Sequence, residues 1–218
     1  AIRRGGMQTP TAASDVFDVD TSTQAINSSN APPRTPFPVD MGIYKARNAS
    51  GTAWPIFARL QGANYLQTQA VDAEGSGYTT WDQMDGWGIS TASWESSANY
   101  VFYNWKRAPS YFDVVAYSGT GSATTVSHNL GVAPEMMWIK RRSAAENWAV
   151  YHSALGNNKV ILLQSNGAAY SDSAFNNTTP TNSVFSVSNA TETNASGSTY
   201  IAYLFATLAG VSKVGSYT

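Results

Sequence analysis

Cysteine is absent from this chain of 218 residues, and only 12% of its residues are charged. A chain without cysteine can form neither a disulfide nor a thiolate metal site. Its 13 basic and 14 acidic residues nearly cancel, so the sequence lacks the basic surface that nucleic acid or an anionic membrane attracts. No apolar run approaches the roughly 18 residues of a membrane-spanning helix. We therefore expect no nucleic-acid partner and no membrane insertion.

Histidine is also scarce, with His128 and His152 as its two occurrences. Because cysteine is missing, nucleophilic catalysis would need a serine–histidine arrangement, and the chain has no G-x-S-x-G motif. His128 lies in "SHNLG", where a His-Asn turn that closes a strand is the simplest interpretation. His152 ends the segment "WAVYH". We therefore expect a protein that is not an enzyme and that carries no cofactor.

Acidic residues offer two weak alternatives to that expectation. A glycan-cleaving spike would need two carboxylates about 5 to 10 Å apart, and Asp82 and Asp85 in "WDQMDGW" could share a loop. Asp15, Asp18 and Asp20 alternate in "SDVFDVD", but a strand would point them partly to different faces, and no EF-hand pattern follows. We expect no metal site.

Short strand-forming segments dominate the chain. Hydrophobic residues make up 43% of the sequence and aromatic residues 12%. Segments rich in β-branched and aromatic residues recur every 8 to 15 residues or so, as in a sandwich or barrel. No segment has a sustained helical period, so the sequence predicts an all-β protein. The second half contains eight predicted strands, at 111–118, 122–128, 135–142, 147–152, 159–164, 168–175, 182–188 and 198–206.

An internal repeat with an offset of 95 residues organises these segments. The pairs that match at this offset are Phe17/Phe112, Asp18/Asp113, Val19/Val114, Asp40/Glu135, Met41/Met136, Lys45/Lys140 and Arg47/Arg142. One gap later Trp54 matches Trp148, and "YVFYNWKR" matches "YIAYLFAT" near the end of each half. A repeat of this length indicates duplicated domains rather than a solenoid, whose units have about 20 to 50 residues. Because the acids before the inner strands are repeated, we expect them to bind a turn or the repeated arginines.

The repeat predicts two tandem antiparallel β-sandwich domains of jelly-roll type, at 1–107 and 108–218. Residues 1–4 resemble the end of a unit and residues 211–218 resemble the start of one. We therefore expect the sequence to be a stretch of a longer string of similar units. In the segment "YIAYLFA" both alternating sets of side chains are apolar, which predicts burial on both faces, with a neighbouring chain as one candidate cover.

Several segments of both halves together resemble a known family. "HNLGVAPEMMWIKRR", "NWAVYH" and "YIAYLFA" resemble a repeated β-domain of tail-fibre-like structural proteins of marine bacteriophages, including cyanophages. In the first half, "FPVDMGIYKAR" resembles the more divergent unit that precedes this domain in such proteins. The resemblance covers nearly the whole chain. It implies a structural component of the extracellular phage particle, in a tail fibre or appendage, with host attachment as a further role.

The same resemblance implies the partners of the chain. A fibre protein is expected to be a homo-oligomer, with a trimer as the usual state, and to contact other virion proteins. A host surface glycan is the candidate external partner. Two other functions are open alternatives: a capsid decoration or head fibre protein, and a polysaccharide-degrading tailspike.

The stretch "YTTWDQMDGWGISTASW" is the candidate binding surface. Trp81, Trp87 and Trp94 lie there among Asp82 and Asp85. Sugar sites combine flat aromatic faces with carboxylate and amide groups, so these five residues form a candidate contact with a glycan. Tryptophan is also frequent in cores and subunit contacts, and we favour that interpretation. The corresponding stretch of the second half, "AYSDSAFNNTTPTN", has fewer aromatic residues, so the halves are not expected to share this surface.

Overall fold

The computed structural model describes residues 7–21, 34–49, 53–77, 79–89 and 99–217. Within these ranges the chain is mostly strand and loop, and the helical elements are η1 (Ala13–Asp15), η2 (Arg59–Gln61) and the α-helix α1 (Thr191–Asn194). The predicted all-β class is confirmed. Across the described ranges, no helix has the length and apolar character needed to cross a membrane.

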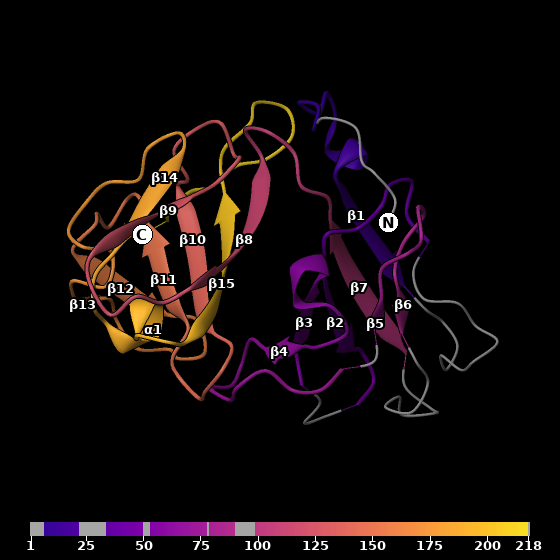
Figure 1. The fold of residues 1–218 in the computed structure, drawn as a ribbon. Helices are drawn as coiled ribbons and strands as arrows, with labels where there is room; N and C mark the ends of the chain where they lie inside the picture. Colours follow the sequence, from indigo (N-terminus) through magenta and orange to yellow (C-terminus); the bar gives the residue numbers. More distant parts are fainter. Residues whose placement is uncertain (1–6, 22–33, 50–52, 78, 90–98, 218) are drawn as a thin grey trace.

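Two antiparallel sheets carry the fold (Figure 1). The N-terminal sheet has five strands, in the order β1 (Phe17–Thr21), β7 (Tyr100–Trp105), β2 (Met41–Ala46), β3 (Pro55–Ala58) and β4 (Leu66–Gln67). The C-terminal sheet has six, in the order β13 (Tyr170–Ser171), β12 (Lys159–Leu162), β11 (Ala149–His152), β10 (Met136–Arg141), β15 (Thr199–Phe205) and β8 (Phe112–Ser118). Two smaller pairs are β5 (Thr79–Thr80) with β6 (Gly88–Ile89), and β9 (Thr124–Ser127) with β14 (Val184–Val187).

All eight strands predicted for the second half are present, each shorter than predicted. They are not divided into two sheets of similar size. Six strands form one sheet, and β9 pairs with β14 as a separate two-stranded sheet. Side chains of this small sheet, Val126, Phe185 and Val187, join the core on one face of the large sheet. The half is therefore built of unequal layers.

The two large sheets repeat the same strand order and the same register. Strands β1, β7, β2, β3 and β4 correspond in sequence and in neighbours to β8, β15, β10, β11 and β12. Phe17 pairs with Trp105 in the first sheet, and their equivalents Phe112 and Phe205 pair in the second. The other three strand pairings repeat in the same way. Because a slip of one residue turns every side chain to the other face, equivalent residues occupy equivalent faces.

The repeated acids have equivalent structural roles. Asp40 Oδ2 accepts the backbone N–H of Arg107 at 2.8 Å, and Glu135 Oε2 accepts that of Thr207 at 3.0 Å. Arg107 and Thr207 are themselves equivalent, because each is the second residue after the last strand of its half. Both acids therefore bind a turn, which is one of the two roles expected from the sequence. The repeated Arg142 pairs elsewhere, with Glu74.

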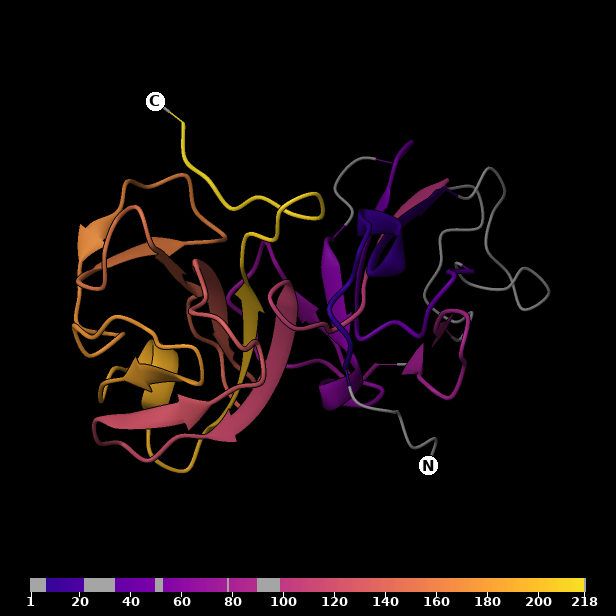
Figure 2. The same cartoon turned by 90° about the horizontal axis from the view of Figure 1, so that it is seen from above.

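The equivalent faces of the two sheets pack against each other (Figures 1 and 2). Their shared core contains Met41, Ile43, Ile56, Ala58 and Leu66 from the N-terminal sheet, and Phe112, Val114, Trp148, Ile201 and Tyr203 from the C-terminal half. Each half also has a separate core on the opposite face of its sheet. The halves are thus joined by a continuous apolar contact rather than by a linker alone.

Strand β15 is buried on both faces, as its sequence predicts. Tyr200, Ala202 and Leu204 enter the core beneath the β9–β14 pair. Ile201 and Tyr203 enter the core shared with the N-terminal sheet. The expected cover of the second face by a neighbouring chain is wrong, because the N-terminal half of the same chain covers that face. Both faces are apolar because the sheet lies between two layers.

Candidate functional site

The predicted tryptophan patch is partly a core element. Trp87 is 0% exposed on the outer face of the N-terminal sheet, and its Nε1 donates to Asn104 Oδ1 at 2.8 Å. Trp81 is half-buried and stacks on Trp87, with 5.7 Å between the ring centroids. Its Nε1 donates to the backbone oxygen of Gly62 at 2.7 Å. The interpretation that favours core packing therefore holds for Trp87, which cannot present its face to a ligand.

The other members of the patch lie on the surface or outside the described residues. Asp82 and Asp85 are exposed, and Asp85 forms an exposed ion pair with Arg34. Trp94 lies outside the described residues. The two carboxylates of the tailspike alternative line neither of the clefts described below.

The histidines lie at two different places. His128 is buried and closes β9 as expected, with Nδ1 accepting the backbone N–H of Leu130 at 3.2 Å and Nε2 lying 3.3 Å from the oxygen of Thr181. Burial lowers the pKa of His128, which favours the neutral ring with Nε2 as the donor. His152 lines a small cleft near the C-terminus. Among the described residues, the hydrogen-bond partners of both histidines are backbone groups.

The alternating aspartates near the N-terminus do not converge. Asp15 caps the turn before it by accepting the backbone N–H groups of Ala12 and Thr11, which lower its pKa. Burial raises the pKa of Asp18, and the nearby charge of Asp20 raises it further. In the described part of the chain, no three His, Cys, Asp or Glu side chains are grouped to hold a metal ion.

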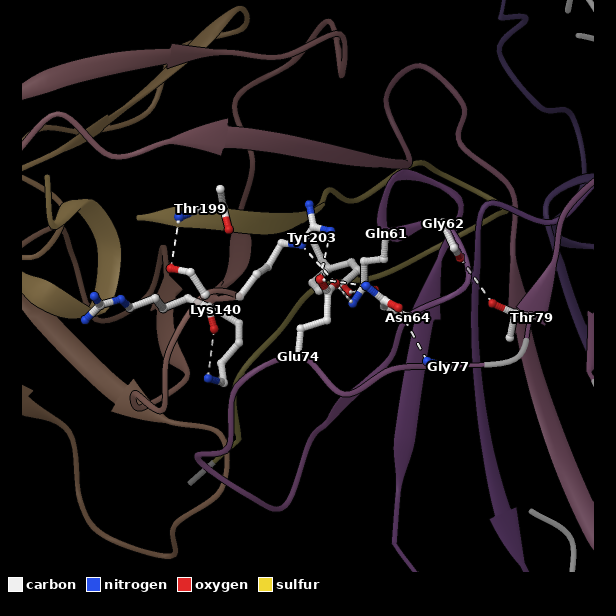
Figure 3. Close-up of polar contacts among 12 residues, drawn as sticks. Gln61, Gly62, Asn64, Glu74, Gly77, Thr79, Lys140, Thr199 and Tyr203 are labelled. Carbon is white, nitrogen blue, oxygen red and sulfur yellow. Dashed lines mark hydrogen bonds and ion pairs between the residues drawn. The ribbon is translucent and has the colours of Figure 1, made fainter. Parts of the chain in front are cut away.

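The segment after β4 clamps the N-terminal half onto the C-terminal sheet (Figure 3). Glu74 accepts two hydrogen bonds from Arg142, from Nε and from a terminal nitrogen, each at 2.9 Å. The same carboxylate accepts from the side-chain amides of Gln61 at 3.0 Å and Asn64 at 3.3 Å. Tyr203, at the centre of the shared core, donates its hydroxyl to Gln61 Oε1 at 2.9 Å. This network fixes the position of one half relative to the other.

Lys140 is a second part of the clamp. Its side chain is 0% exposed, and Nζ donates to the backbone oxygens of Val71 and Arg141, both at 3.0 Å. Burial lowers the pKa of Lys140 from 10.5 to about 8, because a low-dielectric surrounding disfavours the charged form. The ammonium thus binds the backbone of the first half from within the second.

Trp148 and its repeat Trp54 are anchored alike but differ in exposure. Gln164 Oε1 accepts the backbone N–H of Trp148 at 3.1 Å, and the equivalent Gln69 Oε1 accepts that of Trp54 at 2.9 Å. Trp148 is fully buried, and its Nε1 donates to the backbone oxygens of Gln67, at the end of β4, and of Ala70, at 3.0 and 3.1 Å. Trp54 is 38% exposed. The contact between the halves is closed at Trp148 and open at Trp54.

A cleft of about 590 Å³ lies on the open side, and we term it the aromatic cleft. Its aromatic walls are Trp54, Tyr103, Trp105 and Trp138. Its remaining walls are Ile43, Thr68, Gln69, Leu163, Gln164, Ser165 and Asn166. Both halves contribute equivalent positions, because Ile43/Trp138, Thr68/Leu163 and Gln69/Gln164 are pairs at the repeat offset.

A smaller cleft of about 420 Å³ shares Trp105 with the aromatic cleft as a lining residue. Phe17, Met136, His152 and Phe205 line it, together with the C-terminal segment 211–215. Its walls are largely apolar. The aromatic cleft is the better candidate site, because it combines apolar faces with several groups that donate and accept hydrogen bonds.

The residues of the aromatic cleft were not chosen from the sequence. The sequence instead indicated Trp81, Trp87 and Trp94 as a patch, because they are close together in the chain. The signal for the cleft was instead the repeat, which pairs Trp54 with Trp148 and, fifteen or sixteen residues later, Gln69 with Gln164. Finding the cleft from this signal would also have required knowing that the two halves face each other.

The comparisons with known proteins match a family model and no individual protein. Neither the curated proteins nor the solved structures contain a match to this chain. A family model described as a domain of unknown function, DUF7483, matches residues 60–218. The matched range includes the segment that clamps the two halves, strand β7 and the whole C-terminal sheet. It covers more than half of the chain, which therefore belongs to the DUF7483 family.

Proposed function

We propose that this chain is a structural segment of a bacteriophage virion, in which two copies of one β-unit form part of a tail fibre or similar appendage. The observation that carries the proposal is the repeated strand order and register of the two sheets. Serial copies of one unit build an extended particle component from a single chain. The resemblance of "HNLGVAPEMMWIKRR" to the repeated domains of phage tail-fibre-like proteins supports the same function.

We further infer that 1–107 and 108–218 are the two units and that each is a sandwich related to the jelly roll. The separate core on the outer face of each sheet supports this division. The turn after the last strand is also repeated. Ala108 N–H donates to the oxygen of Phe112 at 3.0 Å, and Leu208 N–H donates to that of Ser212 at 3.2 Å. The chain thus leaves the second unit as it leaves the first.

Immunogold electron microscopy of particles of the encoding virus tests the role, with an antibody raised against this chain. Label on the tail appendages supports the proposal, and label on the capsid supports the head-fibre alternative instead. Particles that neither bind the antibody nor contain peptides of this chain by mass spectrometry would exclude a virion component. Light scattering on the purified chain tests the proposed homotrimer separately.

The tailspike alternative has its own test. Purified chain would be incubated with capsular polysaccharide of the host, and new reducing ends would be measured. Release of reducing ends that is lost in Asp82→Asn would favour an enzyme over a structural role. We expect no release, because Asp82 and Asp85 are exposed and Asp85 is engaged by Arg34.

A further inference from the structure

We propose that the aromatic cleft binds a neutral saccharide chain at the junction of the two units. This goes beyond the structural role and places binding away from the Trp81–Trp94 stretch. It does not depend on assembly into a fibre, because the isolated chain contains every wall of the cleft.

The aromatic walls suit the apolar faces of sugar rings. Trp54, Tyr103, Trp105 and Trp138 all line the cleft, and each keeps part of its surface exposed. Indole and phenol rings bury a large apolar area with few rotatable bonds. Exposing the apolar surface of an aromatic ring to water is unfavourable in free energy. A ligand with C–H faces would remove part of that surface from water.

The polar walls suit hydroxyl groups rather than ions. Thr68, Gln69, Gln164, Ser165 and Asn166 supply amide and hydroxyl groups. An amide both donates and accepts hydrogen bonds, as a sugar hydroxyl does. None of the eleven lining residues carries a charge, and the ammonium of Lys45, 5.2 Å from the centroid of the Trp54 ring, already has that ring as its partner. The complementary ligand is therefore a neutral saccharide.

The two glutamines are held in place before any ligand arrives. Gln69 Nε2 donates to Gln67 Oε1 at 2.7 Å, and Gln164 Nε2 donates to Asn147 Oδ1 at 2.8 Å. Their oxygens accept the backbone N–H groups of Trp54 and Trp148. Each amide retains a second N–H and a second lone pair. Fixing these side chains beforehand reduces the entropy that binding would cost.

The size and asymmetry of the cleft also favour a ligand. A volume of about 590 Å³ lies within the usual range for small-ligand sites, about 300 to 1,000 Å³. On the Trp148 side the end of β4 and the residues after it seal the contact between the halves. On the Trp54 side the equivalent tryptophan remains 38% exposed. The duplicated contact has thus kept one side closed for stability and one side open.

The test uses the full chain labelled with ¹⁵N and titrated with neutral hexasaccharides: cellohexaose, laminarihexaose, xylohexaose, maltohexaose, mannohexaose and chitohexaose. Alginate and carrageenan oligosaccharides serve as charged comparisons. The seven tryptophans give separate indole N–H signals. We expect one neutral sugar to shift the signals of Trp54, Trp105 and Trp138, and to leave Trp87 and Trp148, which are fully buried, unshifted.

Variants locate the binding. Trp54→Ala and Asn166→Ala change exposed cleft residues, and each should weaken binding at least about tenfold. Leu60→Ala and Met84→Ala remove exposed apolar side chains that do not line the cleft, and they should leave affinity unchanged. Circular dichroism and thermal melting confirm that all four variants are folded.

Four outcomes would overturn the proposal. The first is that no neutral sugar shifts the signals at concentrations up to about 10 mM, and the second is that the charged sugars alone bind. The third is that Trp54→Ala still binds the neutral sugar with unchanged affinity. The fourth is that the chain forms a dimer and that Trp54→Ala dissociates it. The last result would make the cleft a subunit contact. None of these outcomes bears on where the chain lies in the particle, so the structural proposal is decided separately.

Discussion

Glu74 and Arg142 lie in different halves of the chain and are joined by two hydrogen bonds of 2.9 Å. The side chains are only 11% and 18% exposed, and Gln61 and Asn64 complete the shell of the carboxylate. Arg142 repeats Arg47, whereas Glu74 comes from a segment between β4 and β5. The ion pair therefore belongs to the contact between the halves rather than to the repeated unit.

Removing this carboxylate should destabilise the protein strongly. Glu74→Gln leaves the mostly buried guanidinium of Arg142 without its charge partner, and we expect a loss of about 3 kcal/mol in the free energy of unfolding. Urea denaturation measures it. The matched control is Asp85→Asn, which breaks the exposed pair with Arg34 and should cost less than about 1 kcal/mol. Equal effects of the two substitutions would contradict the role of the clamp.

Lys140 should make stability depend on alkaline pH. The pKa of Lys140 is lowered by burial to about 8 in the folded protein, from 10.5, so the unfolded chain binds the proton more tightly. Between these values the stability contributed by Lys140 rises with pH, by no more than about 3 kcal/mol. The measurement is the difference in unfolding free energy between wild type and Lys140→Met at about pH 7, 8, 9 and 10. These values span the range between the two pKa values. A difference that is constant or falls with pH would contradict the prediction.

Gly42 should not tolerate a side chain. A Cβ there would lie 2.7 Å from Cζ2 of Trp87, whereas the equivalent position in β10 is the buried Met137. We expect Gly42→Ala to destabilise by about 1 to 3 kcal/mol. In the background of Trp87→Leu the same substitution should cost much less, because the overlapping ring is gone. Additive effects in this double-mutant cycle, measured in urea, would show that the two residues are not coupled.

The halves should not be fully stable when separated. A fragment of residues 108–218 would expose Phe112, Val114, Ile201 and Tyr203, which lie in the core shared with the N-terminal sheet. We expect this fragment to bind the dye ANS and to melt at a lower temperature than the full chain, because the apolar face loses its cover. Cooperative melting at the temperature of the full chain, without dye binding, would show instead that the shared core contributes little.

Local sequence pattern predicted the strands well. The eight strands of the second half were found because each is a short run of β-branched and aromatic residues between turn residues. The role of Asp40 and Glu135 also followed from sequence, since both copies place an acid before the second strand of the sheet. What could not be predicted was that β9 and β14 form a sheet of their own, because strand pairing depends on long-range contacts.

The candidate site was harder to predict for a related reason. Trp87 in "DGWGI" and Trp54 in "TAWPI" each follow small or polar residues, yet one is fully buried and the other is 38% exposed. The difference arises from Gly42, which admits the ring of Trp87, and from the partner half, which covers Trp148 but not Trp54. The apolar residues on both faces of β15 indicate a second cover, but they do not identify the other half of the chain as that cover.

The packing of equivalent faces has a consequence for the origin of the molecule. A lone ancestral unit with this face would have left a broad apolar surface in water, and a second identical polypeptide is the simplest match for a self-complementary surface. Tandem gene duplication then converts such a homodimer into one chain. Once fused, the copies are free to diverge, and a pair of identical tryptophans can become one sealed anchor and one accessible ring.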